Sequence, residues 1–403
     1  MSASRTIPIF PAKTPSTVTN LEFRISPPLA LYVHVPWCVQ KCPYCDFNSH
    51  EANGEIPERE YVAALIADLQ SALPLIWGRP VVSVFFGGGT PSLLSPAAID
   101  ELLAAFRALA MLSPEAEITL EANPGTVEAA KFAGFSKAGV NRVSLGIQSF
   151  NDDHLKALGR IHGADEAKRA AQLAAEHFAS FNLDLMYGLP GQTLAQALSD
   201  VETALSFKPP HLSCYQLTLE PNTRFAAFPP ELPEGDTCAD MQEAIEARLA
   251  AAGFANYETS AFAQTGKQCR HNLNYWHFGD YLGIGAGAHS KLTQHDRVLR
   301  QMRWKHPSAY LQNISAGTPV QEETRVDASG LPFEFLMNAL RLADGFPPAL
   351  YESRTAQSIN GILPRLLAAQ ADGLLAISPE RIAPTLRGRR FLNVLLERFL
   401  DEA

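Results

Sequence analysis

The sequence lacks any apolar run long enough to cross a membrane. Its longest apolar runs, such as residues 81–86, fall far short of the roughly 20 residues that a spanning helix needs. Residues 1–28 contain five prolines and several serines and threonines, but no apolar core of the signal-peptide type. We therefore expect a flexible N-terminal tail over residues 1–28, no transmembrane segment and a cytoplasmic location; transient membrane association stays open.

Basic residues are also fewer than acidic residues. The 403 residues include 33 Lys and Arg against 42 Asp and Glu, which gives a formal net charge of -9. Nucleic acid and anionic membrane surfaces are therefore not expected as general partners. A hydrophobic share of 46% is that of a globular protein, and the length allows one large domain plus a smaller one.

Cysteine is scarce but concentrated. Only six are present, and Cys38, Cys42 and Cys45 lie within eight residues. In a reducing cytoplasm such clustering favours a metal site over a disulfide framework.

Short β-type runs alternate with amphipathic helical runs from residue 29 to about residue 260. This rhythm predicts an α/β fold with a mainly parallel sheet, either an open doubly wound sheet or a partial barrel. The predicted strands are Ala30–Val35, Val81–Phe86, Glu117–Glu121, Arg142–Ile147, Phe181–Tyr187 and His211–Leu219. The predicted helices include Tyr61–Leu73, Ala97–Leu109, Glu166–His177 and Leu194–Phe207.

The pattern of predicted strands and helices changes after about residue 265. A Gly-rich stretch and β-type residues are followed by helices that flank a short strand pair, Leu374–Ile377 and Ile382–Ala383. Helices around a small β-wing predict a winged-helix-like module. We therefore divide the chain into the tail (1–28), a core domain (29–265) and a C-terminal domain (266–403).

The loop Cys38-Val-Gln-Lys-Cys42-Pro-Tyr-Cys45 directly follows the first predicted strand. Three thiolates with this spacing can hold three irons of a 4Fe-4S cubane and leave the fourth iron open. S-adenosylmethionine (SAM) can chelate that open iron, and an electron from the cluster can then cleave its sulfonium. The alternative is a structural zinc site, which needs a fourth ligand from Cys269, Cys214 or His34.

Polar or Gly-rich groups follow five successive predicted strands. They are the cysteine loop, Gly87-Gly88-Gly89-Thr90-Pro91, Glu121 with Asn123, Gln148 with Ser149, and Asp184 with the turn 188–193. Ligands bind where parallel strands deliver their carboxyl ends, and consecutive glycines let the backbone approach a ligand closely. Asp184 lies within an otherwise apolar strand and therefore needs a polar partner. Singly, each of these residues has a cap or turn role as its alternative.

Two further candidates lie outside these strand ends. Arg160 follows a short predicted helix and is either a surface cation or a partner for the carboxylate of SAM. His271 heads a polar and aromatic cluster that includes Tyr275 and Trp276. This histidine is either a candidate ligand for heme iron or a packed residue at a domain junction.

At these residues the sequence resembles the radical SAM superfamily, and within it the oxygen-independent coproporphyrinogen dehydrogenase group. The match spans roughly residues 29 to 390. It is carried by Tyr32-Val-His-Val-Pro-Trp-Cys38, the cysteine loop, Gly-Gly-Gly-Thr-Pro, Glu121-Ala-Asn-Pro, Gly146-Ile-Gln-Ser and Asp184-Leu-Met-Tyr-Gly-Leu-Pro-Gly-Gln-Thr. The resemblance implies an incomplete (β/α)6 barrel of the TIM type with a C-terminal helical domain.

The resemblance also implies site residues. Cys38, Cys42 and Cys45 would ligate the 4Fe-4S cluster. Lining the SAM site would be Tyr32, Tyr44, Gly88, Gly89, Thr90, Glu121, Gln148, Arg160 and Asp184.

One departure from the dehydrogenases selects a subgroup. Those enzymes carry a further cysteine two residues after the third cluster ligand, where this sequence has Phe47. They also have a longer N-terminal arm. Both differences, together with His271-Asn-Leu-Asn-Tyr-Trp276, resemble the heme chaperones of the group, which bind heme and deliver it to acceptors such as respiratory proteins.

Two functions therefore follow from the resemblance. The first is a heme chaperone that carries a cluster and exchangeable SAM, with coproporphyrinogen dehydrogenase activity absent. The alternative is the oxidative decarboxylation of coproporphyrinogen III. Radical SAM catalysis on another substrate is a third option.

Overall fold

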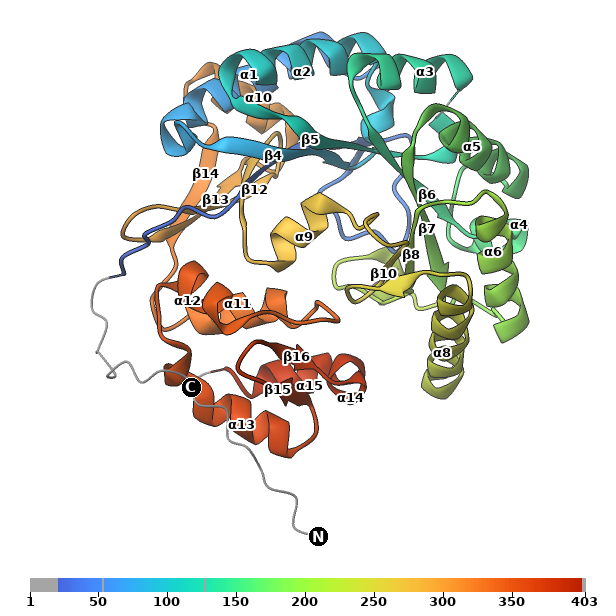
Figure 1. Cartoon of the computed structure of the whole chain (residues 1–403). Coiled ribbons are helices and arrows are strands. Elements are labelled where there is room, and N and C mark those ends of the chain that lie inside the picture. The colour runs from blue at the N-terminus through green and yellow to red at the C-terminus, as the bar shows by residue number, and fades with distance from the viewer. Residues whose placement is uncertain (1–20, 53, 127, 401–403) are drawn as a thin grey trace.

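The computed structural model describes residues 21–400 except 53 and 127, and a twelve-stranded sheet runs through most of it (Figure 1). Its centre is a run of parallel neighbours that contains all six predicted strands. These strands are β1 (Leu29–Val35), β4 (Pro80–Gly88), β5 (Met111–Ala122), β6 (Arg142–Gln148), β7 (Ser180–Tyr187) and β8 (His211–Gln216). Their residues are mostly buried, which explains their apolar sequences.

Helices cover the outer face of these strands (Figure 1). They are α1 (Glu58–Ile76), α2 (Pro96–Leu109), α3 (Ala129–Ala138), α4 (Asp152–Ala157), α5 (Ala164–His177) and α6 (Leu194–Ser206), with 3₁₀ turns η1 (Pro91–Leu93) and η2 (Pro124–Thr126). Helix α2 begins as its sequence predicts, because Ser95 Oγ accepts the Ala98 N–H at 3.1 Å and Pro96 occupies the first turn. The predicted partial (β/α)6 barrel is thus confirmed.

The sheet continues beyond both edge strands of this partial barrel, β1 and β8. Beside β1 lie β11 (Asp280–Ile284), β12 (His289–Thr293), β13 (Val298–Arg303) and β14 (Val320–Arg325), and beside β8 lie β10 (Ala261–Ala263) and β9 (Ala255–Asn256). The intervening elements are β2 (Trp37–Cys38), β3 (His50–Glu51), α7 (Arg224–Ala227), α8 (Gly235–Ala251), α9 (Arg270–Trp276) and α10 (Pro307–Ser315). The domain boundary predicted after residue 265 stays a prediction, and strands from both sides of it share this sheet.

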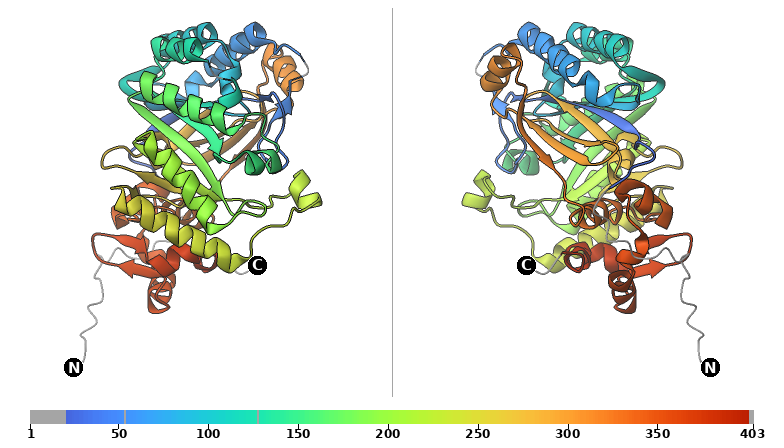
Figure 2. Two further views of the ribbon diagram at one scale, coloured as in Figure 1. Left: turned by 90° about the vertical axis from the view of Figure 1, so that its right-hand side faces the viewer. Right: turned by 90° about the vertical axis from the view of Figure 1, so that its left-hand side faces the viewer.

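The C-terminal helices gather at one end of the molecule, away from α1, α2 and α3 (Figures 1 and 2). They are α11 (Leu331–Ala339), α12 (Pro348–Thr355), α13 (Leu363–Ala371), α14 (Leu386–Arg390) and α15 (Leu392–Glu397), with the 3₁₀ turn η3 (Ile359–Gly361). An antiparallel pair, β15 (Leu375–Ile377) and β16 (Ile382–Pro384), forms the predicted wing. These elements have a hydrophobic core of their own.

Of the tail predicted over residues 1–28, the structure describes the part from residue 21 onward. Residues 1–20 lie outside the described part of the chain. From residue 21 onward the chain is packed: the Leu21 and Phe23 side chains are buried in the C-terminal core, and Phe23 N donates to His295 O at 2.8 Å. Burial of these two apolar side chains keeps this part of the tail on the protein.

Helix α9 lies on the inner side of the curved sheet (Figure 1). It contacts β1, β4 and β11 on the sheet and α11 in the C-terminal helices. Across the described residues, no helix combines the length and the apolar character that crossing a membrane requires.

Candidate functional site

The cysteine loop is held by a main-chain bond at its start and by the side chain of its own Lys41. It lies between β2 and β3, which pair with each other in parallel. Thr90 N donates to Trp37 O at 2.7 Å, and Lys41 Nζ donates to Phe47 O at 3.3 Å and Ser49 O at 3.2 Å. The loop is therefore folded around its own lysine and fastened to the end of β4.

Asn48 ties the loop to the segments that follow β11 and β13, on the side of the sheet next to β1. Its side-chain amide donates to Ala286 O at 3.0 Å and to Lys305 O at 2.9 Å. Gly287 has a φ of +77°, and a Cβ added there would come within 2.2 Å of Asn48 Nδ2. The Gly-rich stretch that the sequence places near His271 thus supports the cysteine loop.

The three loop thiols are free and half-buried. Burial raises the pKa of the Cys38 and Cys45 thiols above the ordinary value. Arg160 Nη1 donates to Cys42 Sγ at 3.5 Å, and Ser49 Oγ lies 3.9 Å from Cys45 Sγ. Unbridged thiols with a guanidinium beside them suit a cluster, because bound thiolates need compensating positive charge and hydrogen bonds.

A closed zinc site finds no fourth ligand among the three candidates. The ring nitrogens of His34 are engaged by Tyr32 Oη at 3.1 Å and Asn48 O at 2.8 Å. Cys269 Sγ donates to Glu117 Oε1 at 3.3 Å, and Cys214 is buried in the main core. Within residues 21–400, less 53 and 127, no three His, Cys, Asp or Glu side chains converge closely enough for a single metal ion.

Glu121 and Asp184 are buried carboxyl groups inside the barrel, and they interact electrostatically with each other. Burial and the nearby Asp184 charge together raise the pKa of Glu121 to about 8. Glu121 Oε2 accepts the Gly88 N–H at 3.3 Å. Asp184 has the polar partners that its sequence position predicts: Ser144 Oγ donates at 3.0 Å and Asn182 Nδ2 at 2.7 Å.

Arg160 and Gln148 lie at the end of β6. Arg160 Nη2 donates to Gly146 O at 2.8 Å, while Tyr215 Oη donates to Gln148 Oε1 at 2.6 Å. The Nε of Arg160 is buried and has no hydrogen-bond partner in the described protein, which leaves a donor for an anionic ligand. Arg160 is therefore not a surface cation, and its position fits the carboxylate of SAM.

The glycines at the end of β4 also pack closely within the protein. A Cβ on Gly88 would lie 2.6 Å from the His34 ring, and one on Gly89 would lie 2.5 Å from Trp37 O. Both glycines are needed for packing against the strand that enters the cysteine loop. Their small size therefore serves the protein's own packing, and the predicted approach of a ligand to this backbone stays a prediction.

The predicted residues form two groups around the cysteine loop. Tyr32 stacks on Phe85 with ring centroids 6.3 Å apart and bonds His34, close to Gly88, Gly89, Thr90 and Glu121. Tyr44, Gln148, Arg160 and Asp184 make up the second group, on the cysteine loop and the ends of β6 and β7. Burial raises the pKa of Tyr44 above its ordinary value.

Sequence reasoning missed several polar residues of this interior. They are Ser144, Asn182, Ser213, Tyr215 and Arg142. The available signal was period-two polarity, because residues 142, 144, 146 and 148 share one face of β6. Equivalent alternation occurs at 182 and 184 in β7 and at 213 and 215 in β8.

His271 lies within the barrel rather than at an open surface. Its Nδ1 is 3.1 Å from Ser83 Oγ, and its ring packs on Phe85 with centroids 4.7 Å apart. Burial lowers the pKa of His271 to about 4, so the ring is neutral at pH 7. Trp276 Nε1 is buried without a hydrogen-bond partner in the described structure, and Tyr275 is partly exposed.

Known proteins resemble this chain along most of its length. Residues 32–204 match the radical SAM superfamily, and residues 327–391 match the HemN C-terminal domain. The chain is 51% identical over 378 residues to the heme chaperone HemW of Escherichia coli (strain K12), covering 93% of this chain and 99% of that protein. It is 41% identical over 388 residues to the bovine protein named radical S-adenosyl methionine domain-containing protein 1, mitochondrial, covering 91% of this chain and 86% of that protein.

The fold has a solved counterpart. The structure of E. coli coproporphyrinogen III oxidase (HemN), described as a radical SAM enzyme, superposes with a TM-score of 0.79 at 23% identity, covering 96% of this chain and 95% of that one. This likeness confirms the barrel and the C-terminal helices. Taken with the near full-length identity to heme chaperones, it shows that the chain belongs to the HemW family of the radical SAM superfamily.

Proposed function

We propose that this protein is a heme chaperone that carries a 4Fe-4S cluster and exchangeable SAM, binds heme and transfers it to heme-accepting respiratory proteins. The observation that carries the proposal is the 51% identity to a HemW heme chaperone along nearly the whole of both chains. The radical SAM family implies the cluster and SAM. The cytoplasmic location expected from the sequence stays a prediction.

Cys38, Cys42 and Cys45 would hold the cluster. A cluster so ligated supplies an open iron and an electron. Around it, the protein's own residues have defined tasks: Arg160 offsets the charge at Cys42 and offers a donor to a carboxylate, while Asp184 offers oxygens to hydroxyl groups. Tyr32, Tyr44, Gly88, Gly89, Thr90, Glu121 and Gln148 would complete the SAM site.

Phe47 supports the chaperone over the dehydrogenase. Its side chain is 60% exposed at the cysteine loop, at the position where the dehydrogenases carry a further cysteine. A phenyl ring can neither ligate metal nor transfer a proton. We therefore infer that coproporphyrinogen III is not converted.

One experiment separates the two functions. The reconstituted protein is supplied separately with heme and with coproporphyrinogen III, under reducing conditions with SAM. We expect a Soret band on heme titration and no decarboxylated product. Robust turnover of coproporphyrinogen III would overturn the chaperone proposal.

A further inference from the structure

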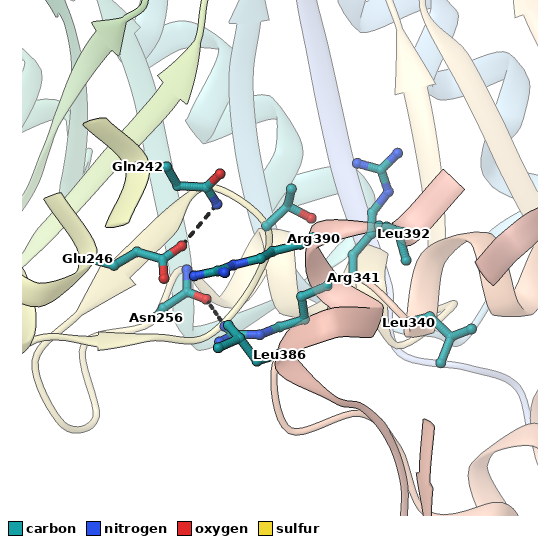
Figure 3. Close-up of a pocket in the computed structure, with 10 residues that line it drawn as sticks. Gln242, Glu246, Asn256, Leu340, Arg341, Leu386, Arg390 and Leu392 are labelled. Atoms are coloured by element: carbon teal, nitrogen blue, oxygen red, sulfur yellow. Dashed lines mark hydrogen bonds between the residues drawn. The ribbon is translucent and has the colours of Figure 1, made fainter. Parts of the chain in front are cut away.

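Heme needs an iron ligand that an incoming molecule can reach. In proteins the iron is held by a His, Met, Cys or Tyr side chain. The groove between α8 and the C-terminal helices (Figure 3) has none of these among the described residues that line it. Its arginines are also engaged, because Arg390 forms an ion pair with Glu243 at 2.8 Å and Arg341 interacts with the buried carboxyl of Glu258. The iron ligand must therefore come from another part of the molecule.

Few of the eleven histidines offer a free ring nitrogen at the surface. Three have both ring nitrogens bonded: His34, His162 and His211. Three are exposed: His289, His295 and His306. Of these, His306 has its Nδ1 2.8 Å from Ser308 Oγ and packs against His50, and His295 lies in the connection between β12 and β13. His289 is the exposed histidine that a strand holds in place.

His289 is the first residue of β12. Every residue from Phe278 to Thr293 is buried except this histidine. Within the described residues, its ring has no hydrogen bond or ion pair. Burial and the nearby positive charges of Lys305 and Arg300 lower the pKa of His289, against the opposing charge of Glu322, so the ring is neutral at pH 7. A neutral imidazole with a free nitrogen can bind iron.

The face of β12 and β13 that carries His289 is covered only in part. His289 lies opposite Met302 in the antiparallel pair, so both side chains point to the same face. The next pair on this face, Lys291 and Arg300, is covered: Lys291 is buried, and Arg300 bonds Glu334 of α11 at 2.5 Å. His289 is exposed and Met302 is half-buried. An open strip, formed by His289 and Met302, therefore remains beside the C-terminal helices.

The cysteine loop borders this open strip. Asn48 of the loop donates to Ala286 O, ahead of β12, and to Lys305 O, after β13. The phenyl ring of Phe47, next to Asn48, is 60% exposed. Lys305 is exposed, and its ammonium group forms no ion pair within the part of the chain that the structure describes. A histidine, a thioether, a phenyl ring and an unpaired ammonium group therefore gather at the edge of the loop.

We propose that His289 is the axial ligand of the heme iron at this open strip. The macrocycle lies against Met302 and Phe47, and Lys305 binds a propionate group. This inference rests on the proposed chaperone function and names the binding site of its cargo. Heme is flat and apolar with two carboxylates at one edge, so an iron ligand, polarizable and apolar contacts and a cation on one side suit it. Glu322 lies beside Met302 and repels carboxylates, which directs the propionates toward Lys305. The other side of the iron stays open to an acceptor protein.

The test titrates heme into the full-length, cluster-loaded protein and follows the Soret band and the electron paramagnetic resonance signal of ferric heme. His289→Ala removes the iron ligand, so the spectrum of histidine-bound heme is lost and affinity falls at least about tenfold, the effect that even outer-shell partners of metal ligands have. His289→Gln gives the same loss while keeping a polar side chain. Added imidazole restores the spectrum in both variants, because it supplies the missing nitrogen. His295→Ala is the matched control: this histidine is exposed on the same hairpin, and its loss changes neither property.

Two variants test the rest of the site. Lys305→Gln weakens heme binding about two- to fivefold, the contribution of an exposed ion pair. The same variant does not change the affinity for heme dimethyl ester, whose carboxylates are blocked. Met302→Gln weakens the binding of both ligands alike, because it places a polar group against the macrocycle. The iron and sulfide content of each variant shows whether the cysteine loop, and with it the fold, is intact.

Each other outcome overturns a defined part of the proposal. If wild-type protein binds no heme, the proposed function fails and this site fails with it. If wild-type protein binds heme and His289→Ala keeps both spectrum and affinity, the function stands and His289 is not the ligand. If His271→Ala loses the spectrum while His289→Ala keeps it, heme is bound inside the barrel instead. If Lys305→Gln weakens binding of the dimethyl ester as much as that of heme, Lys305 does not bind a propionate.

Discussion

The guanidinium of Arg160 donates to the thiol sulfur of Cys42 across 3.5 Å, although 118 positions separate the two residues in the sequence. The same guanidinium bonds Gly146 O at the end of β6. One arginine therefore links the cysteine loop to the interior of the barrel. The proposed cluster and the proposed SAM site meet at this side chain.

Replacing Cys38, Cys42 or Cys45 by Ala abolishes the cluster, because a cubane needs all three thiolates. Anaerobic reconstitution followed by iron and sulfide analysis and electron paramagnetic resonance measures it. Cys238→Ala is the control, since this thiol is buried on α8 and donates to Pro233 O at 3.7 Å. Retention of a full cluster in any loop variant, or stoichiometric zinc without iron uptake, would contradict the ligand set.

Arg160→Gln shifts the reduction potential of the cluster to more negative values, because a positive charge beside Cys42 stabilises the reduced, more negative cluster. We also expect weaker SAM binding. Arg160→Lys keeps the charge and retains more of the potential, while losing the fork that a carboxylate needs. An unchanged potential in the glutamine variant would show that the 3.5 Å contact does not act on the cluster.

Asp184→Asn weakens SAM binding and leaves the cluster in place. Ser144 and Asn182 each donate to one oxygen of Asp184, and asparagine has nearly the same shape but keeps one acceptor oxygen, so the charge and one of these two bonds are lost. Asp200→Asn is the matched control: this buried carboxyl accepts from Ser149 Oγ and Phe150 N, both at 2.7 Å, outside the predicted site. Equal SAM affinity in the two variants, measured by calorimetry, would remove Asp184 from the site.

Glu121 makes the stability of the cluster-free protein depend on pH. The pKa of Glu121 in the folded state, about 8, exceeds the ordinary value of 4.5. Between these values the folded state holds a proton that the unfolded state has released, so stability falls as pH rises, by at most about 1.4 kcal/mol per pH unit. Glu121→Gln therefore flattens the pH dependence of denaturant unfolding between pH 5 and 8. A slope equal to that of the unmodified protein would show that Glu121 is ionised in the fold.

Gly287→Ala lowers cluster occupancy although residue 287 lies far from the cysteines in the sequence. An added Cβ would come within 2.2 Å of Asn48 Nδ2 and break the anchor of the cysteine loop. Gly361→Ala is the control, because nothing lies within 4 Å of a Cβ there and its φ is not positive. Equal iron content in the two variants would show that this anchor is dispensable.

Many elements of the barrel could be predicted from short stretches of the sequence. The six parallel strands are apolar runs of strand length, and Ser95-Pro96 specifies a helix start, so both could be predicted without the fold. The three cysteines with their spacing predict a cluster loop in the same way, and that role stays a prediction. Asp184 was predicted to need partners because a carboxyl in an apolar strand is costly when left alone.

Only the tertiary structure decided which distant residues meet. Ser144 lies beside Asp184, Tyr215 bonds Gln148, and Asn48 reaches Ala286, because strand order and register bring them together. The residues of these pairs lie 40, 67 and 238 positions apart in the sequence, and local periodicity does not encode such pairings. The packing of Gly88 and Gly89 against His34 and Trp37 arises for the same reason: it is made by segments that become neighbours only when the chain is folded.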